Sequence, residues 1–116
     1  MKRVIKFRHD KFAGIKLESI DVKDEALSTE FLHCNIGWSD NTSFAKQVFL
    51  APNVVLICDQ RGQEKQMQRT LVVNTKIETV TIYGDCLVCF FDGANHYGFD
   101  AKEFDELYPL FEAMKG

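Results

Sequence analysis

The spacing of apolar and polar residues predicts a chain made mainly of β-strands. Near the N-terminus, Ile5 and Phe7 alternate with basic residues at positions 2, 6 and 8, a two-residue period typical of a strand with one polar face. Further strands are expected at 15–18, 54–58, 70–73, 77–83 and 86–91, with a short edge strand at 96–99. The segment 86–91 is apolar on both faces and should lie at the centre of a sheet. Gly84-Asp85 precedes it and predicts a tight hairpin with the strand at 77–83.

Positions 27–36 fit two patterns. As a helix they would gather Leu27, Phe31 and Cys34 on one side, and as a strand they would place apolar residues on both faces. The strand is favoured because Ser28 and Thr29 are modest helix formers.

A short helix is expected near 42–51. Several N-cap candidates precede it, Phe44, Val48 and Phe49 follow at helical spacing, and Pro52 would end it.

The last segment gives the clearest helical signal. Asp100 and Glu103 have the spacing of a capping box, and Phe99 and Phe104 stand at the two positions of a hydrophobic staple. One apolar stripe then runs through positions 104, 107, 108, 111 and 114, and we expect it to pack on the strands at 77–83 and 86–91. Pro109 predicts a kink or a break in this helix.

These elements predict an α+β fold in which an antiparallel sheet or half-barrel packs against a C-terminal amphipathic helix. The length of 116 residues fits a single domain spanning 1–116, and 46% apolar residues suffice for a core. The longest apolar run, at 86–91, is too short to span a membrane, and the N-terminus lacks the apolar stretch of a signal peptide. We therefore expect a soluble protein of the cytoplasm with no membrane partner.

The net charge of −3 is distributed in blocks. Residues 1–16 carry six basic side chains and one acidic one, whereas residues 77–116 carry two basic and eight acidic ones. Such blocks can form charged surface patches or can pair with one another, and the sequence leaves both open. Nucleic acid is not the expected partner, because the chain is acidic overall. Weak nucleic-acid binding through the basic N-terminal strand and the basic residues of the next polar segment is nevertheless the third functional hypothesis; those residues are Lys2, Lys6, Arg8, Arg61, Lys65 and Arg69.

Four cysteines occur, two of them in a C-x-x-C pattern at Cys86 and Cys89. In a strand, residues three apart point to opposite faces, so these two thiols should neither bond to each other nor share a metal ion. Buried reduced thiols are the expected state, and neither a metal site nor a cofactor is predicted.

Two further groups of residues are candidate site residues. Asp92 and His96 could act as a carboxylate and a general base, although Asp92 begins an Asp-Gly-Ala-Asn stretch typical of a turn. Trp38 and Tyr97 could bind a ligand, as could Arg61, Lys65 and Arg69.

A complete core signature without a catalytic constellation favours a small non-enzymatic binding or interaction module. We expect a homodimer with a protein partner or small-molecule ligand, and an accessory protein of a phage or mobile element fits this profile. The alternative is a small hydrolase-type enzyme that uses Asp92 and His96.

Overall fold

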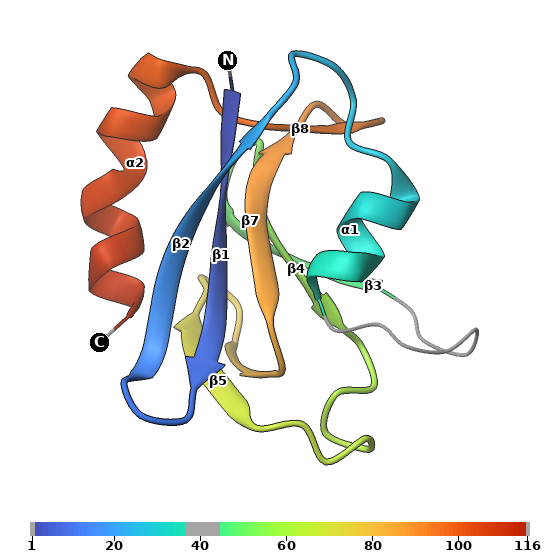
Figure 1. The fold of residues 1–116 in the computed structure, drawn as a ribbon, viewed down its shortest axis with the longest axis vertical. Helices are drawn as coiled ribbons and strands as arrows, with labels where there is room; N and C mark the ends of the chain where they lie inside the picture. Colours follow the sequence, from blue (N-terminus) through green and yellow to red (C-terminus); the bar gives the residue numbers. More distant parts are fainter. Residues whose placement is uncertain (1, 37–44, 116) are drawn as a thin grey trace.

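The computed structural model describes residues 2–36 and 45–115 (Figure 1). Its strands are β1 (Lys2–Asp10), β2 (Gly14–Val22), β3 (Ala45–Ala51), β4 (Val54–Asp59), β5 (Arg69–Asn74), β6 (Thr79–Tyr83), β7 (Cys86–Phe91) and β8 (His96–Tyr97), and its helices are α1 (Thr29–Asn35) and α2 (Ala101–Met114). The α+β class, with antiparallel strands leading into a C-terminal helix, is confirmed. In the described part of the chain, no helix is long and apolar enough to cross a membrane.

Six strands form the main sheet, in the order β2-β1-β7-β4-β3 with β8 beside β7. The prediction that 86–91 is central is confirmed, since β7 pairs with β1, β4 and β8. The expected edge strand at 96–99 lies inside the sheet instead. Phe99 exchanges two backbone hydrogen bonds with Arg3 of β1 (3.0 and 2.7 Å), and β8 pairs with β7. Gly98 permits this close approach, because a Cβ at that position would collide with the side chain of Val22.

The two faces of the main sheet are covered differently. One face packs against α2 and the two-stranded β5–β6 ribbon. The core on this side includes Ile5, Leu56 and Val88 from the sheet and Phe111 from α2. The other face packs against α1. The core on this side includes Val55 and Leu87 from the sheet and Leu32 from α1. Figure 1 shows the two helices on opposite sides of the sheet.

The strand expected at 27–36 is wrong, because Thr29–Asn35 is the helix α1. Ser28 is its N-cap, and the Ser28 hydroxyl accepts a hydrogen bond from the Phe31 N–H (3.0 Å). Of the two residues that argued against a helix, Ser28 lies just outside it, where serine is favoured, and Thr29 is its first residue. Leu32 and Ile36 then reach the same side and pack on the sheet.

The short helix expected near 42–51 is also wrong over residues 45–51, which form β3; positions 42–44 lie outside the described residues. Pro52 and Asn53 link β3 to β4 as a two-residue turn, with Asn53 at φ 66°. Proline followed by a residue with positive φ fits a type II turn. Pro52 therefore starts a hairpin rather than ending a helix.

The hairpin expected at Gly84-Asp85 is absent from the described residues, since β6 pairs with β5 and not with β7. The Gly84 N–H donates to the Gln68 carbonyl (2.8 Å), and the Thr70 hydroxyl donates to the Gly84 carbonyl. Gly84 has φ +84°, which an L side chain rarely adopts. The dipeptide is therefore a corner that carries the chain from the ribbon into the main sheet.

The helix α2 has the predicted capping box, in which Asp100 accepts from the Glu103 N–H at 2.8 Å. Phe104 and Phe111 are buried, and Phe111 is 0% exposed. The nearest strands are β1 and β5, so the expected docking on 77–83 and 86–91 is only partly right, although all these strands contribute to one core cluster. The helix runs without interruption through Pro109 to Met114, so of the two outcomes expected there the break is wrong.

Candidate functional site

An open groove of about 530 Å³ runs between β3 and the turn that joins β5 to β6. Every residue from Lys46 to Pro52 lines one wall, and residues 74–78 line the other. Successive side chains of a strand point to opposite faces, so a wall made of consecutive residues follows the edge of β3 rather than one of its faces.

The edge of β3 that faces away from β4 has no strand partner among the described residues. The backbone groups that it presents follow from the neighbouring strands. The Phe91 N–H donates to the Asn53 carbonyl (2.8 Å), which makes Asn53–Phe91 a hydrogen-bonded pair of the β4–β7 ladder. Because the ladder alternates, residues 55 and 57 of β4 turn their backbone groups to β7, and residues 56 and 58 turn theirs to β3.

The β3–β4 register then assigns the outer edge of β3. Val48 is opposite Leu56 and Lys46 is opposite Cys58, so Val48 and Lys46 bond inward to β4. Gln47 lies between Lys46 and Val48, and Phe49 follows Val48, so Gln47 and Phe49 turn their N–H and C=O groups outward. The edge thus offers two donors and two acceptors along the groove.

The opposite wall is a turn held by Thr75. Its hydroxyl accepts from the N–H groups of Ile77 (3.3 Å) and Glu78 (3.1 Å) and donates to the Glu78 carbonyl (2.9 Å). Ile77 is 94% exposed at this turn. The turn therefore holds the apolar side chain of Ile77 in solvent beside the groove. None of the other described residues covers this side chain.

The aromatic side chain of β3 adds to the exposed apolar surface. Phe49 is 53% exposed and its ring packs against Phe91 with centroids 6.1 Å apart. Phe91 stacks in turn on His96 at 4.7 Å, and His96 Nε2 lies 2.6 Å from Gln47 Oε1. These contacts fix the side chains of β3 on the face that α1 partly covers.

Asp92 and His96, the catalytic pair considered from the sequence, lie at the two ends of one turn, with Asp92 directly after β7 and His96 at the start of β8. The Asp92 carboxylate accepts from the N–H groups of Asn95 (2.7 Å) and Ala94 (2.8 Å), and these hydrogen bonds lower its pKa. Burial lowers the pKa of His96, whose ring is bonded to Gln47. Within the described chain no hydrogen bond joins Asp92 to His96, and neither residue lines the groove, nor does Tyr97 in β8.

The basic candidates of the second polar segment lie in the loop between β4 and β5 and at the start of β5. Arg61 bonds to Glu64 (2.8 Å) and Lys65 to the buried Asp59 (2.7 Å), which holds the 60–68 loop together. Arg69 is exposed at the start of β5, opposite Tyr83. Trp38 lies outside the described residues.

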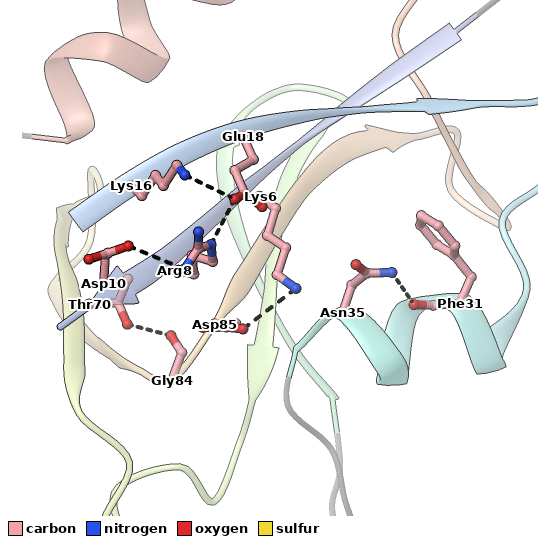
Figure 2. Close-up of polar contacts among 10 residues, drawn as sticks. All are labelled: Lys6, Arg8, Asp10, Lys16, Glu18, Phe31, Asn35, Thr70, Gly84 and Asp85. Atoms are coloured by element: carbon pink, nitrogen blue, oxygen red, sulfur yellow. Dashed lines mark hydrogen bonds and ion pairs between the residues drawn. The ribbon is translucent and has the colours of Figure 1, made fainter. Parts of the chain in front are cut away.

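The basic side chains of the first strand pair with acidic neighbours (Figure 2). Lys6 contacts Asp85 (3.5 Å), and Arg8 bonds to Glu18 (2.8 Å) and lies 3.6 Å from Asp10. Lys2 likewise reaches Asp24 (3.3 Å). Of the two possibilities that the charge blocks left open, internal pairing describes this face.

The two cysteines of the C-x-x-C pattern face opposite sides of β7, as predicted: Cys86 belongs to the core under α2 and Cys89 to the core under α1. Burial raises the pKa of the Cys89 thiol to about 12. Among the described residues, no three His, Cys, Asp or Glu side chains gather in a way that could hold a metal ion.

Sequence reasoning missed the groove because it assigned β3 to a helix. The signal that could have revealed it is Pro52-Asn53 directly before the apolar run at Val54, a turn pair typical of a hairpin. Comparison of the chain with models of protein families, with curated proteins and with solved structures found no match.

Proposed function

We propose that the protein is a small non-enzymatic binding module that takes up an extended segment of a partner protein along the outer edge of β3. The observation that carries this proposal is the groove that follows consecutive residues of β3, an edge strand with no outer partner in the part of the chain that the structure describes. An added strand supplies affinity through main-chain hydrogen bonds, and pockets for alternate side chains supply specificity.

The dimensions fit such a segment. Residues 46–52 span about 20 Å at the rise of a β-strand, which an extended segment of about six or seven residues would cover. The outward groups of Gln47 and Phe49 would bond to its backbone. Val48 and Leu50, which point to the face of the core under α2, would contact its side chains near the exposed Ile77.

A single extended segment fits the groove better than the edge of a second copy. The 74–78 turn stands beside β3, so two copies paired edge to edge would each bring this second wall to the contact. The homodimer expected from the sequence is therefore a prediction independent of the groove, and it does not require that two β3 edges pair. A hydrolase is the weaker hypothesis, because the Asp92 carboxylate is occupied by its own turn.

The test uses a displayed library of random peptides selected on the whole protein, followed by affinity measurement with two variants. Gln47→Pro removes one outward N–H while leaving the inward bonds of β3, and proline is tolerated at such edge positions. Gln47→Ala is the matched control, since both variants lose the side-chain contact with His96. Selected peptides should bind the wild type and Gln47→Ala alike and should bind Gln47→Pro about tenfold more weakly, as expected for one lost hydrogen bond.

Three results would contradict the proposal. The first is a library that yields no peptide. The second is a set of peptides that bind Gln47→Pro as tightly as Gln47→Ala. The third is a self-associating wild type whose dimer, disrupted by Gln47→Pro, excludes peptides; the edge would then bind a second copy of this chain.

A further inference from the structure

Cys58 and Cys86 occupy opposite positions on neighbouring strands. In the β4–β7 ladder, Leu56 is opposite Val88 and Ile57 is opposite Leu87. One further step places Cys58, inside β4, opposite Cys86, the first residue of β7. Both side chains point into the core under α2, where they belong to one buried cluster.

The hydrogen-bond alternation also tells which kind of pair this is. Asn53–Phe91 is a hydrogen-bonded pair, so the pairs at 55–89 and 57–87 are hydrogen-bonded as well, and 58–86 is a non-hydrogen-bonded pair. In such pairs the Cα atoms are about 4.5 Å apart and the side chains approach most closely. A disulfide needs Cα atoms roughly 4.4–6.8 Å apart, so a pair that continues the β4–β7 register by one residue has the spacing that the bond requires.

We propose that Cys58 and Cys86 are a pre-positioned dithiol that forms a cross-strand disulfide when the protein meets a small-molecule disulfide as oxidant. Both thiols are free in this structure. Cys89 is the nearest cysteine to Cys86 in the sequence, but it lies on the opposite face of β7, as predicted, and cannot be its partner.

The reaction proceeds by two exchanges. The thiolate of one cysteine attacks the oxidant, forms a mixed disulfide and releases one small thiol. The thiolate of the second cysteine then attacks the protein sulfur of that mixed disulfide and releases the second small thiol. Two protein thiols lose two protons and two electrons, and one molecule of oxidant becomes two thiols.

Cys58 is the better candidate for the first attack. It is 3% exposed whereas Cys86 is 0% exposed. Burial raises the pKa of Cys58 to about 11, and burial also raises the pKa of Cys86 well above its ordinary value. The thiolate is scarce at neutral pH in both cases, so the reaction of the folded protein should accelerate as the pH rises.

The bond would close the segment from 58 to 86 into a loop. That segment contains the β5–β6 ribbon and hence the 74–78 wall of the groove. Closing such a loop restricts the unfolded chain, so the oxidised protein should melt at a higher temperature than the reduced protein.

The experiment treats the whole protein with oxidised glutathione in two ways: folded at mildly alkaline pH, and during refolding from urea in a glutathione redox buffer. Free thiols are then alkylated in denaturant and the protein is analysed by mass spectrometry. The expected product has lost two hydrogens and two alkylation sites, and its digest contains a peptide pair joined through Cys58 and Cys86. Cys86→Ser should abolish this product, and Cys89→Ser, the matched control on the same strand, should retain it.

Each other result overturns the proposal. Absence of the bond under both conditions would show that the thiols are not pre-positioned, as would a bond to Cys34 or Cys89. Glutathione adducts as the sole product would mean that the second exchange cannot occur. A lower melting temperature of the oxidised protein would mean that the bond distorts the sheet.

Discussion

Replacing Phe111 with alanine tests how α2 is held against the rest of the fold. Phe111 is 0% exposed, and its ring packs against Phe99 (centroids 5.9 Å apart) and Phe104 (6.4 Å). Phe99 precedes the helix and is bonded through its backbone to β1, so it cannot easily move into a vacated space. A cavity left by Phe111→Ala should therefore collapse little.

The expected cost follows from this rigidity. Truncation of a buried phenylalanine costs about 3–5 kcal/mol, with the larger values at sites that cannot collapse. A domain of this size is stable by about 5–15 kcal/mol, so the variant should lose a large share of its stability. With a urea slope of about 1–3 kcal/mol per molar, the unfolding midpoint should fall by about 1–5 M.

Two variants on the same helix serve as comparisons. Leu110 is 41% exposed, so Leu110→Ala should change the free energy of unfolding by about 0.5 kcal/mol or less. Asp100→Ala removes the bond to the Glu103 N–H at an exposed site and should also cost clearly less than Phe111→Ala. If urea melts showed Phe111→Ala to be milder than Asp100→Ala, the helix would not be docked through Phe111, and its apolar stripe would be a surface open to a partner.

Three further outcomes are expected. Ellman's reagent should label one thiol of the described cysteines rapidly in the native protein, because Cys34 alone among them is exposed, and fast labelling of further thiols would contradict their burial. Lys65→Met should lower the free energy of unfolding by about 3 kcal/mol in urea melts, because it leaves the buried carboxylate of Asp59 without its cation, and a neutral effect would show that water or another group replaces the lysine. Fluorescence anisotropy at physiological salt should detect no submicromolar binding of DNA or RNA, and such binding, lost on Lys6→Glu, would revive the nucleic-acid hypothesis.

The features that the sequence predicted correctly are those with a local cause. The capping box of α2 needs only Asp100 and Glu103 at the right spacing. Helical periodicity alone likewise predicted the side on which Phe104 and Phe111 are buried, although Tyr108 of the same stripe is exposed. The central place of β7 follows from apolar residues on both of its faces. The opposite orientation of Cys86 and Cys89 follows from the geometry of any strand.

Two of the errors concern segments whose structure depends on distant partners. Positions 77–83 and 86–91 are neighbours in sequence, yet β6 pairs with β5, because Gly84 bonds to Gln68 and turns the chain into the second sheet. Likewise, β3 is a strand because β4 pairs along it, although the spacing of Val48 and Phe49 also fits a helix. The outward backbone groups of β3 could not be predicted at all, since they depend on the register of three strands.

The two edges of the main sheet differ in a way that bears on function. Natural edge strands are usually guarded by charges, by bulges or by other elements. The outer edge of β2 carries the exposed polar side chains of Lys16, Ser19 and Asp21. β3 has fewer of these protective features. Its register shift, between Phe49 and Ala51, affects only the end of the strand, and Lys46 is the only charged residue within the strand. An edge that combines a half-exposed phenylalanine with a facing groove is costly to leave open in water, and a partner segment that pairs with it is the simplest reason for such an edge to persist.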